Sequence, residues 1–481
     1  MLDVTAPAEP VVVRPPELRT AGLVVALALG VAADLGVRGD PANLVLAVAL
    51  GGTIVLLLAS RATRRTSARL LLVAALVPVA MLAVRASPWL TVSNLALAFA
   101  LVGSALLFGR QGTILDATPA TWLRRLGPAG RAVVHVGDDA VTARRDTSGR
   151  HAPRLGRVVR AVALALPFLV VALVLLAHAD VVFADLVAPD LDAGAGIGHA
   201  VVAVGAAVAV IAAWGIASRI DAHDVRRTGT FGALEAATML GLVAAVLGAF
   251  VVAQLLALTG AGERLVREAG LTPAQYARSG FFELCWATLV ITVLLAVIRR
   301  VCAPGTFDRP ALRCLYAAVP ALTIGLVVVS LRRMAYYDSA FGLTMLRVWA
   351  VGGAIAIGLV LVALSVRNAR FPAANPIGAV ALLVAFVLVA GADVANPEAF
   401  VVRHNVARSR AGATIDLGYL GTLSADAIPQ IAASFRGRPA LVRHLAGCGT
   451  PQGVGRLNLA EDRAVSIRDR VCGRRAGPVV G

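Results

Sequence analysis

The stretch "ALTIGLVVVSLRRMAYYDSAFGLTMLRVWAVGGAIAIGLVLVAL" (residues 321–364) places a polar segment between two long apolar runs. Each run has about twenty residues, the length that an α-helix needs to cross a hydrocarbon layer of roughly 30 Å. The polar segment contains arginines, tyrosines and an aspartate, which are costly in lipid and suit a water boundary. The stretch therefore predicts two membrane-crossing helices joined by a short polar connection.

The rest of the chain repeats this pattern. Of its 481 residues, 58% are hydrophobic and 15% are charged, whereas a soluble domain has about 25% charged residues. Together with the two of this stretch, eleven apolar runs lie at 21–37, 41–60, 68–85, 89–108, 161–178, 198–217, 233–257, 280–298, 312–331, 342–366 and 376–392. We therefore expect an all-α, polytopic helical membrane bundle of about 11 transmembrane helices. The first run is the weakest, because it is short and has Asp34 near its end.

The arginines predict the orientation of the bundle. All 45 basic residues are arginine, and most of them flank apolar runs. Connections on the side of the N-terminus hold roughly three times as many arginines as the opposite connections, and such an excess marks the cytoplasmic side. The N-terminus is therefore expected inside and the C-terminal tail outside. The net charge of +17 then reflects topology, so we expect membrane lipids and no nucleic acid as partners.

Composition divides the chain into five predicted parts. They are a Pro-rich, disordered cytoplasmic lead (1–20), four transmembrane helices (21–108), a basic cytoplasmic loop (109–157), a seven-helix membrane domain (158–392) and an extracytoplasmic C-terminal domain (393–481). The last part is expected to be small and rich in short helices. Its segment "SADAIPQIAASF" (424–435) favours a helix with Ser424 as the N-cap.

Two cysteines, Cys448 and Cys472, stand alone in the C-terminal tail. The segment between them has a length that a disulfide closes well, and an extracytoplasmic location would allow oxidation. We expect this disulfide, and the alternative is two free thiols.

Three segments occur in an order that resembles a known family. They are "LTPAQYARSGFFEL" (271–284), "RRMAYYDSAFGLTMLR" (332–347) and "NPEAFVVRHNVAR" (396–408), the last followed by "IDLGYL" (415–420). Together they resemble the uncharacterised bacterial integral membrane proteins of domain of unknown function 4173, which is similar to 4153. The resemblance spans roughly 160–435 and leaves out the first four apolar runs. It implies a multi-pass protein of a bacterial cytoplasmic membrane without an established activity. Phe341 stands where the family usually has tyrosine.

The three segments supply the candidate site. Under the predicted topology they all lie at the outer face, with Arg347 inside the tenth span and Glu283 inside the eighth. Our hypothesis is that Glu283 and Arg347 face each other or share a polar cluster with nearby side chains. The candidate substrate-binding residues are Tyr276, Arg278, Glu283, Arg333, Tyr337 and Arg347. The alternative is that Arg347 reaches lipid head groups, Glu283 caps a helix and the aromatic residues form an interfacial belt.

These residues leave three functions open. The first is binding or moving a small molecule, ion or lipid head group through an outer-leaflet polar cluster. The second is an envelope scaffold or signalling role with a protein partner. The third is an enzyme acting on a lipid-linked substrate, with Asp338 or Glu283 as the acid or base. The sequence has no strong metal-ligand spacing and no complete catalytic motif, so we expect no cofactor and no metal, and we favour the two functions without catalysis over the enzyme.

Overall fold

The structure is a computed structural model that describes residues 20–37, 43–59, 65–108, 232–257, 305–370, 377–449 and 457–473, with isolated positions between 203 and 303. Within these residues all regular elements are helices, and there is no strand. The elements are α1 (Thr20–Val37), α2 (Leu44–Ala59), α3 (Thr66–Met81), α4 (Pro88–Phe108), α10 (Ala233–Ala257), the 3-10 turn η2 (Thr306–Asp308), α14 (Pro310–Phe341), α15 (Met345–Arg370), α16 (Ile377–Ala395), α17 (Pro397–Arg410), α18 (Leu417–Gly421), α19 (Ile428–Ser434), α20 (Pro439–Ala446) and α21 (Leu459–Cys472).

Eight of the predicted apolar runs coincide with the helices α1–α4, α10 and α14–α16. Five helices of the described residues are long and apolar enough to cross a membrane, namely α4, α10, α14, α15 and α16, while α1, α2 and α3 contain shorter apolar helices. The runs 161–178, 198–217 and 280–298 lie outside the described residues, apart from isolated positions. The all-helical membrane fold is confirmed, and the number of about 11 spans stays a prediction.

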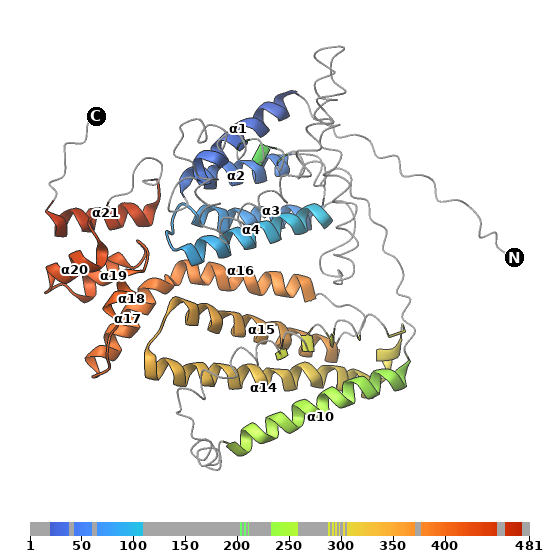
Figure 1. The fold of residues 1–481 in the computed structure, drawn as a ribbon. Helices are drawn as coiled ribbons and strands as arrows, with labels where there is room; N and C mark the ends of the chain where they lie inside the picture. The colour runs from blue at the N-terminus through green and yellow to red at the C-terminus, as the bar shows by residue number, and fades with distance from the viewer. Residues whose placement is uncertain are drawn as a thin grey trace, which may run out of the picture.

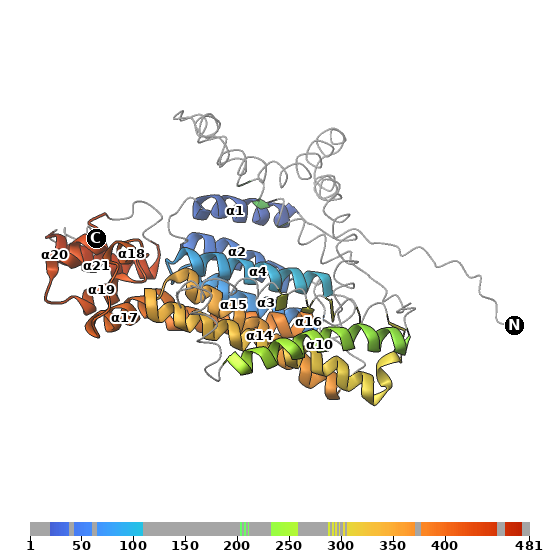
Figure 2. The ribbon, with the colours of Figure 1, turned by 60° about the horizontal axis from the view of Figure 1, so that its bottom comes forward.

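The long helices lie side by side in an order that differs from their order in the sequence (Figure 1). Helix α4 contacts α3 and α16, α16 contacts α15, and α14 lies between α15 and α10. The last long helix, α16, is therefore the one that joins the N-terminal four helices to the α10–α15 group. Figure 2 shows the same neighbours from another side. Many apolar side chains of α16 are exposed, including Leu383 and Val387, as expected for a helix in contact with lipid.

Proline begins several of the helices. α4, α14, α17 and α20 start at Pro88, Pro310, Pro397 and Pro439. A proline at the first position costs no hydrogen bond, because the first N–H groups of a helix have no partner within it, and its fixed φ suits the helix. These prolines fix where the chain leaves the connections and enters the helices.

The polar segment at residues 332–341 is not the loop that the sequence predicts. It forms the last turns of α14, which runs without a break to Phe341. A helix of 32 residues is about 48 Å long at 1.5 Å per residue, so it exceeds a hydrocarbon layer of roughly 30 Å. Arg332, Arg333 and Asp338 can therefore lie beyond the apolar layer while remaining helical. The connection to α15 is only residues 342–344.

The five short helices α17–α21 gather at one end of the bundle, on the left in Figure 1. We call residues 397–449 and 457–473 the cap. The cap contacts the end of α16, the α3–α4 loop (residues 82–87) and the α14–α15 loop (residues 342–344). Residues far apart in the sequence thus meet at one end of the bundle.

Candidate functional site

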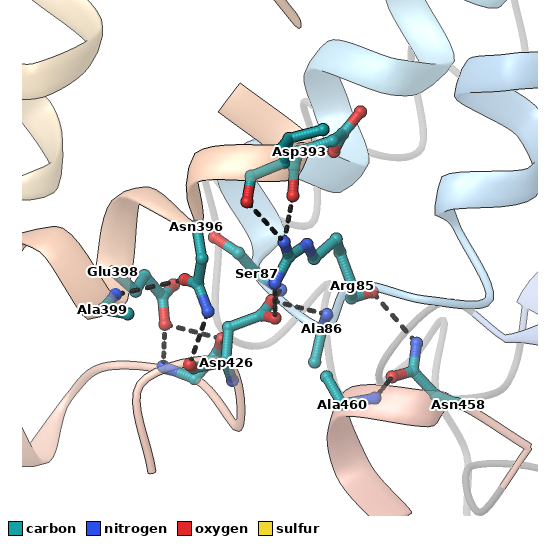
Figure 3. Close-up of polar contacts among 12 residues, drawn as sticks. Arg85, Ala86, Ser87, Asp393, Asn396, Glu398, Ala399, Asp426, Asn458 and Ala460 are labelled. Atoms are coloured by element: carbon teal, nitrogen blue, oxygen red, sulfur yellow. Dashed lines mark hydrogen bonds and ion pairs between the residues drawn. The ribbon is translucent and has the colours of Figure 1, made fainter. Parts of the chain in front are cut away.

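The carboxylate of Asp426, in the cap, binds the α3–α4 loop (Figure 3). Its Oδ2 accepts hydrogen bonds from the backbone N–H groups of Ala86 at 2.7 Å and Ser87 at 2.8 Å. Its Oδ1 lies 3.2 Å from Nη1 of Arg85, and the same guanidinium donates to the main-chain carbonyl of Asp393 at the end of α16. Because the Asp426 side chain is 1% exposed, this ion pair is shielded from water and holds three parts of the chain together.

A second cap residue, Asn458, binds the same loop from another side. Its Nδ2 donates to the carbonyl oxygens of Arg85 at 3.0 Å and Leu82 at 3.2 Å. Its Oδ1 accepts from the N–H groups of Ala460 and Glu461 and so caps helix α21. One buried amide thus positions both the loop and the helix.

The turn from α16 into the cap is made by Asn396. Its φ of 52° lies in the left-handed region, which asparagine tolerates better than most residues. Its Oδ1 accepts from the N–H of Ala399 and caps α17, and its Nδ2 donates to the carbonyl of Asp426 at 2.9 Å. The direction in which α17 leaves the membrane helix is therefore fixed by one side chain.

The α14–α15 loop is held by Asn405 of α17. The amide accepts from the N–H of Leu343 and donates to the carbonyl of Leu343, both at 2.8 Å. Arg408 of the same helix donates to the carbonyl of Ser339 at 2.7 Å. Two of the segments that carry the family resemblance, 332–347 and 396–408, are therefore in direct contact.

Two further contacts extend this junction. The N–H of Met345, at the start of α15, donates to the hydroxyl of Tyr419 at 2.7 Å. His404 Nε2 lies 2.9 Å from a carboxylate oxygen of Asp338. The cap is thus attached to the end of α14 and to the start of α15.

A pocket of about 490 Å³ lies between the bundle and the cap. On the bundle side its lining comes from the start of α4 with the preceding loop and from the start of α15. On the cap side it comes from α17, from α18 with the residues that follow it, from Gly449 and from α21. The lining residues are Ala86, Pro88, Trp89, Met345, Glu398, Tyr419, Thr422, Leu423, Ser424, Ala425, Gly449, Glu461 and Arg468. The bundle side is apolar and aromatic, and the cap side carries the charged and hydroxyl groups.

Glu398 is the most buried acidic side chain of this lining, at 2% exposed. Its Oε2 accepts from the N–H of Ser424 at 2.8 Å and from the hydroxyl of Ser424 at 2.7 Å. Burial raises the pKa of the Glu398 carboxyl above its ordinary value, the hydroxyls of Ser424 and Ser87 lower it in part, and the charge of Asp426 raises it again. Ser424 therefore binds a carboxylate and does not cap α19 as the sequence predicts, since α19 begins at Ile428.

The remaining polar groups of the pocket are also fixed. Arg468 is hydrogen-bonded to the carboxylate of Glu461 and, through Nε, to the carbonyl of Ala446 at 3.0 Å. Burial raises the pKa of the Tyr419 hydroxyl, which keeps it protonated and able to donate while it accepts from Met345. The pocket thus combines two carboxylates, one guanidinium and one phenol beside an aromatic wall.

Replacing Glu398 by glutamine should change how stability depends on pH. Since burial raises the folded-state pKa, the contribution of Glu398 to the free energy of unfolding is present at acid pH and lost as pH rises through the folded-state pKa. Glu398→Gln cannot titrate, so its midpoint of thermal unfolding should lack this decline. The control Glu235→Gln changes an exposed carboxyl on α10 and should keep the wild-type profile. Identical profiles for wild type and Glu398→Gln would contradict the prediction.

The structure joins Cys448 and Cys472 in a disulfide, with Cα atoms 6.1 Å apart and 24 positions apart in the sequence. The bond connects the end of α21, the helix that supplies Glu461 and Arg468 to the pocket, to the segment that contains Gly449. That the bond forms in the cell stays a prediction.

Replacing both cysteines of this pair by serine should lower the free energy of unfolding by about 3 kcal/mol, because the bond restricts the unfolded chain. Thermal unfolding without and with reductant measures the effect. Wild type should lose stability on reduction, and the Cys448→Ser/Cys472→Ser variant should not respond further. The control Cys314→Ser changes an exposed free thiol. A wild-type protein that is equally stable in both conditions would show that the bond does not form.

The predicted site residues are only partly brought together. The guanidinium of Arg347 lies 4.2 Å from the centre of the Tyr337 ring and donates to the carbonyl of Gly342. This contact brings together two of the residues predicted to share a cluster. Arg333, a third predicted member, is half-buried on α14. Tyr276, Arg278 and Glu283 lie outside the described residues, so the proposed pairing of Glu283 with Arg347 stays a prediction. Of the three predicted residues that the structure describes, Arg333, Tyr337 and Arg347, none lines the pocket.

Sequence reasoning missed the residues that build the junction, above all Arg85, Asp426 and Asn458. Each is an ordinary polar residue in a connection, and nothing near it in the sequence sets it apart. Asn94 did carry a signal, because it lies inside the apolar run 89–108, where polar residues are rare and are commonly functional. Asp393 directly follows the run 376–392, so its sequence position did not mark it in this way. Within the described part of the chain, no group of three His, Cys, Asp or Glu side chains is placed to hold a metal ion.

The membrane-length helices, the cap and the pocket define a helical, multi-pass membrane protein with a capped pocket at one end of its bundle. The chain belongs to the family described as domain of unknown function (DUF4153), which it matches over residues 70–434. The match includes α4 and most of α3, so the expectation that the first four apolar runs lie outside the family is wrong for these two helices. No curated protein and no solved structure matches the chain.

Proposed function

We propose that the protein binds the polar head of an amphipathic molecule in the pocket between the bundle and the cap. The observation that carries this proposal is the composition of the lining, in which Glu398, Glu461 and Arg468 share a pocket of about 490 Å³ with Trp89 and Met345. Pockets of roughly 300–1,000 Å³ with a mostly apolar wall and a few fixed polar groups are typical of small-molecule sites.

The charges favour a zwitterionic head group. Glu398 and the ring of Trp89 suit an ammonium group, through a carboxylate and a cation–π contact. Arg468 suits a phosphate or carboxylate. Trp89 is 40% exposed. The centre of its ring lies 6.5 Å from the centre of the Trp349 ring, and Trp349 is near the start of α15. Tryptophans at helix ends are typical of the membrane–water interface, which is where lipid head groups lie.

The same proposal includes a location. We place the pocket at the outer face of a bacterial cytoplasmic membrane, in a bundle of about 11 spans whose N-terminus is inside. Two observations support it. The arginine distribution favours this orientation, and the α3–α4 loop, the α14–α15 loop and the cap share one end of the bundle, as alternating spans require.

Other functions have less support. A docking surface for an envelope partner would need a broad apolar patch, whereas in the described part of the cap the large exposed apolar side chains are Phe400, Leu457 and Leu459. The acid–base candidate Asp338 is paired with His404 and does not line the pocket. Transport is a separate property, and a pocket at one end of the bundle supports binding alone.

Native mass spectrometry of the full-length protein, released from nanodiscs, tests the proposal. Nanodiscs of phosphatidylethanolamine and phosphatidylglycerol compare a zwitterionic with an anionic head group. We expect one tightly retained phosphatidylethanolamine per chain. The variant Thr422→Trp, which fills the pocket from an exposed lining position, should lower retention by about tenfold or more, a loss of about 1.4 kcal/mol.

The matched control is Ser466→Trp, which adds the same side chain at an exposed position of α21 outside the lining. It should retain lipid as the wild type does. Equal retention by both variants, or no retained lipid in the wild type, would contradict head-group binding in this pocket. Preferred retention of phosphatidylglycerol would contradict the zwitterionic assignment.

A further inference from the structure

A buried polar pair lies inside the bundle, apart from the pocket. Asn94 of α4 donates from Nδ2 to Oδ1 of Asp393 in α16 at 2.9 Å. The two residues are 1% and 2% exposed, and the helices that carry them pack side by side (Figure 1). An acidic residue at such a place is costly and therefore points to a function.

Each partner of this pair has an oxygen that lacks a hydrogen bond within the described residues. They are Oδ1 of Asn94 and Oδ2 of Asp393, and both are fully buried. If Asp393 is ionised, both oxygens are acceptors, so neither can donate a hydrogen bond to the other. A buried acceptor without a partner is rare in folded proteins and calls for a physical explanation.

The neighbouring charges are already engaged with each other. Arg85 from the α3–α4 loop uses one amino group for the carboxylate of Asp426 and the other for the main-chain carbonyl of Asp393. Asp426 from the cap also receives two backbone N–H bonds. The positive charge of Arg85 is therefore matched by Asp426. Ionised Asp393 would add a second, unmatched negative charge in a buried place.

We propose that Asp393 is a proton-binding site, with the proton on Oδ2 donated to Oδ1 of Asn94. One proton then satisfies both oxygens, and the carboxylic acid and the amide form a neutral pair with two hydrogen bonds. A metal cation fits less well, because it needs several oxygen ligands and the guanidinium of Arg85 lies next to the same residue. Neither Asn94 nor Asp393 lines the pocket.

Infrared spectroscopy of the full-length protein in nanodiscs tests the assignment. At neutral pH the wild type should show the C=O stretch of a protonated carboxylic acid, shifted on transfer to heavy water. Asp393→Asn should lack this band, and Asp462→Asn, which changes an exposed carboxyl on α21, should keep it. The Asp393→Asn protein should unfold at nearly the wild-type temperature, because an amide reproduces both hydrogen bonds.

Asn94→Leu provides a second test that leaves Asp393 in place. It removes the acceptor, so the band should persist and move toward the frequency of a carboxyl without a hydrogen-bonded O–H. A spectrum in which neither Asp393→Asn nor Asn94→Leu changes a protonated-carboxyl band would overturn the proposal. It would mean that Asp393 is ionised and that an ordered water supplies its missing hydrogen bond.

Discussion

Replacing Asp426 by alanine should detach the cap from the α3–α4 loop and lower the free energy of unfolding by about 3–5 kcal/mol. The wild-type carboxylate accepts from two backbone N–H groups and pairs with Arg85. Alanine leaves the buried N–H groups of Ala86 and Ser87 without an acceptor. Arg85, whose side chain is only 15% exposed, becomes an uncompensated charge. The loss is large because one partner of a buried pair remains.

Thermal unfolding in detergent and limited proteolysis of the cap measure this effect. The control Asp462→Ala removes an exposed carboxyl from α21 and should stay close to the wild type. A double-mutant cycle with Arg85→Ala isolates the ion pair from the backbone bonds, and a coupling energy of about 0.5–3 kcal/mol is expected between residues in contact. If Asp426→Ala is as stable and as protease-resistant as Asp462→Ala, the junction in Figure 3 does not hold the cap.

The second large effect is expected at Asn405. Leucine at this position cannot accept from the N–H of Leu343 or donate to its carbonyl, two bonds of 2.8 Å each. A buried group that loses its partner costs about 1–3 kcal/mol, so the total for the two groups should be roughly 2–6 kcal/mol. The loop begins at Gly342, whose φ of 79° is a conformation that glycine alone adopts readily.

Hydrogen exchange at Leu343 and Met345, together with thermal unfolding, measures the loss at Asn405→Leu. Faster exchange should be confined to the α14–α15 loop and the start of α15. Arg403→Leu is the matched control, since it places leucine at an exposed position of the same helix and should leave exchange in this loop unchanged. Wild-type protection in Asn405→Leu would show that the two family segments are not coupled through this amide.

The helices could be predicted from the sequence because the property that forms them is local. An apolar run of about twenty residues needs its backbone hydrogen bonds satisfied within itself when it lies in lipid. The boundaries at α4 and α10 therefore follow from composition alone. The exception is α14, which continues through Arg332, Arg333 and Asp338. Polar residues end a span without ending a helix.

The site could be predicted only in part, because its contacts join distant parts of the chain. The contact of Arg347 with Tyr337 could be predicted, because only ten positions and one tight loop separate the two residues in the sequence. The pair of Arg85 and Asp426 spans 341 positions, and no periodicity indicates which connections meet at the end of a bundle. The pocket arises from that meeting, so its lining residues were not found.

The most direct test is to introduce one cysteine at a time and to label it in intact cells. The parent chain has Cys285, Cys302 and Cys314 replaced by serine. Arg332→Cys and Gly437→Cys lie at the cap end, and Arg65→Cys and Arg309→Cys lie at the opposite end, all at exposed positions. A membrane-impermeant thiol reagent should modify the first two in intact cells and the other two only after permeabilisation. Equal labelling at both ends, or labelling of the second pair alone, would contradict a bundle that crosses the membrane with its capped pocket outside.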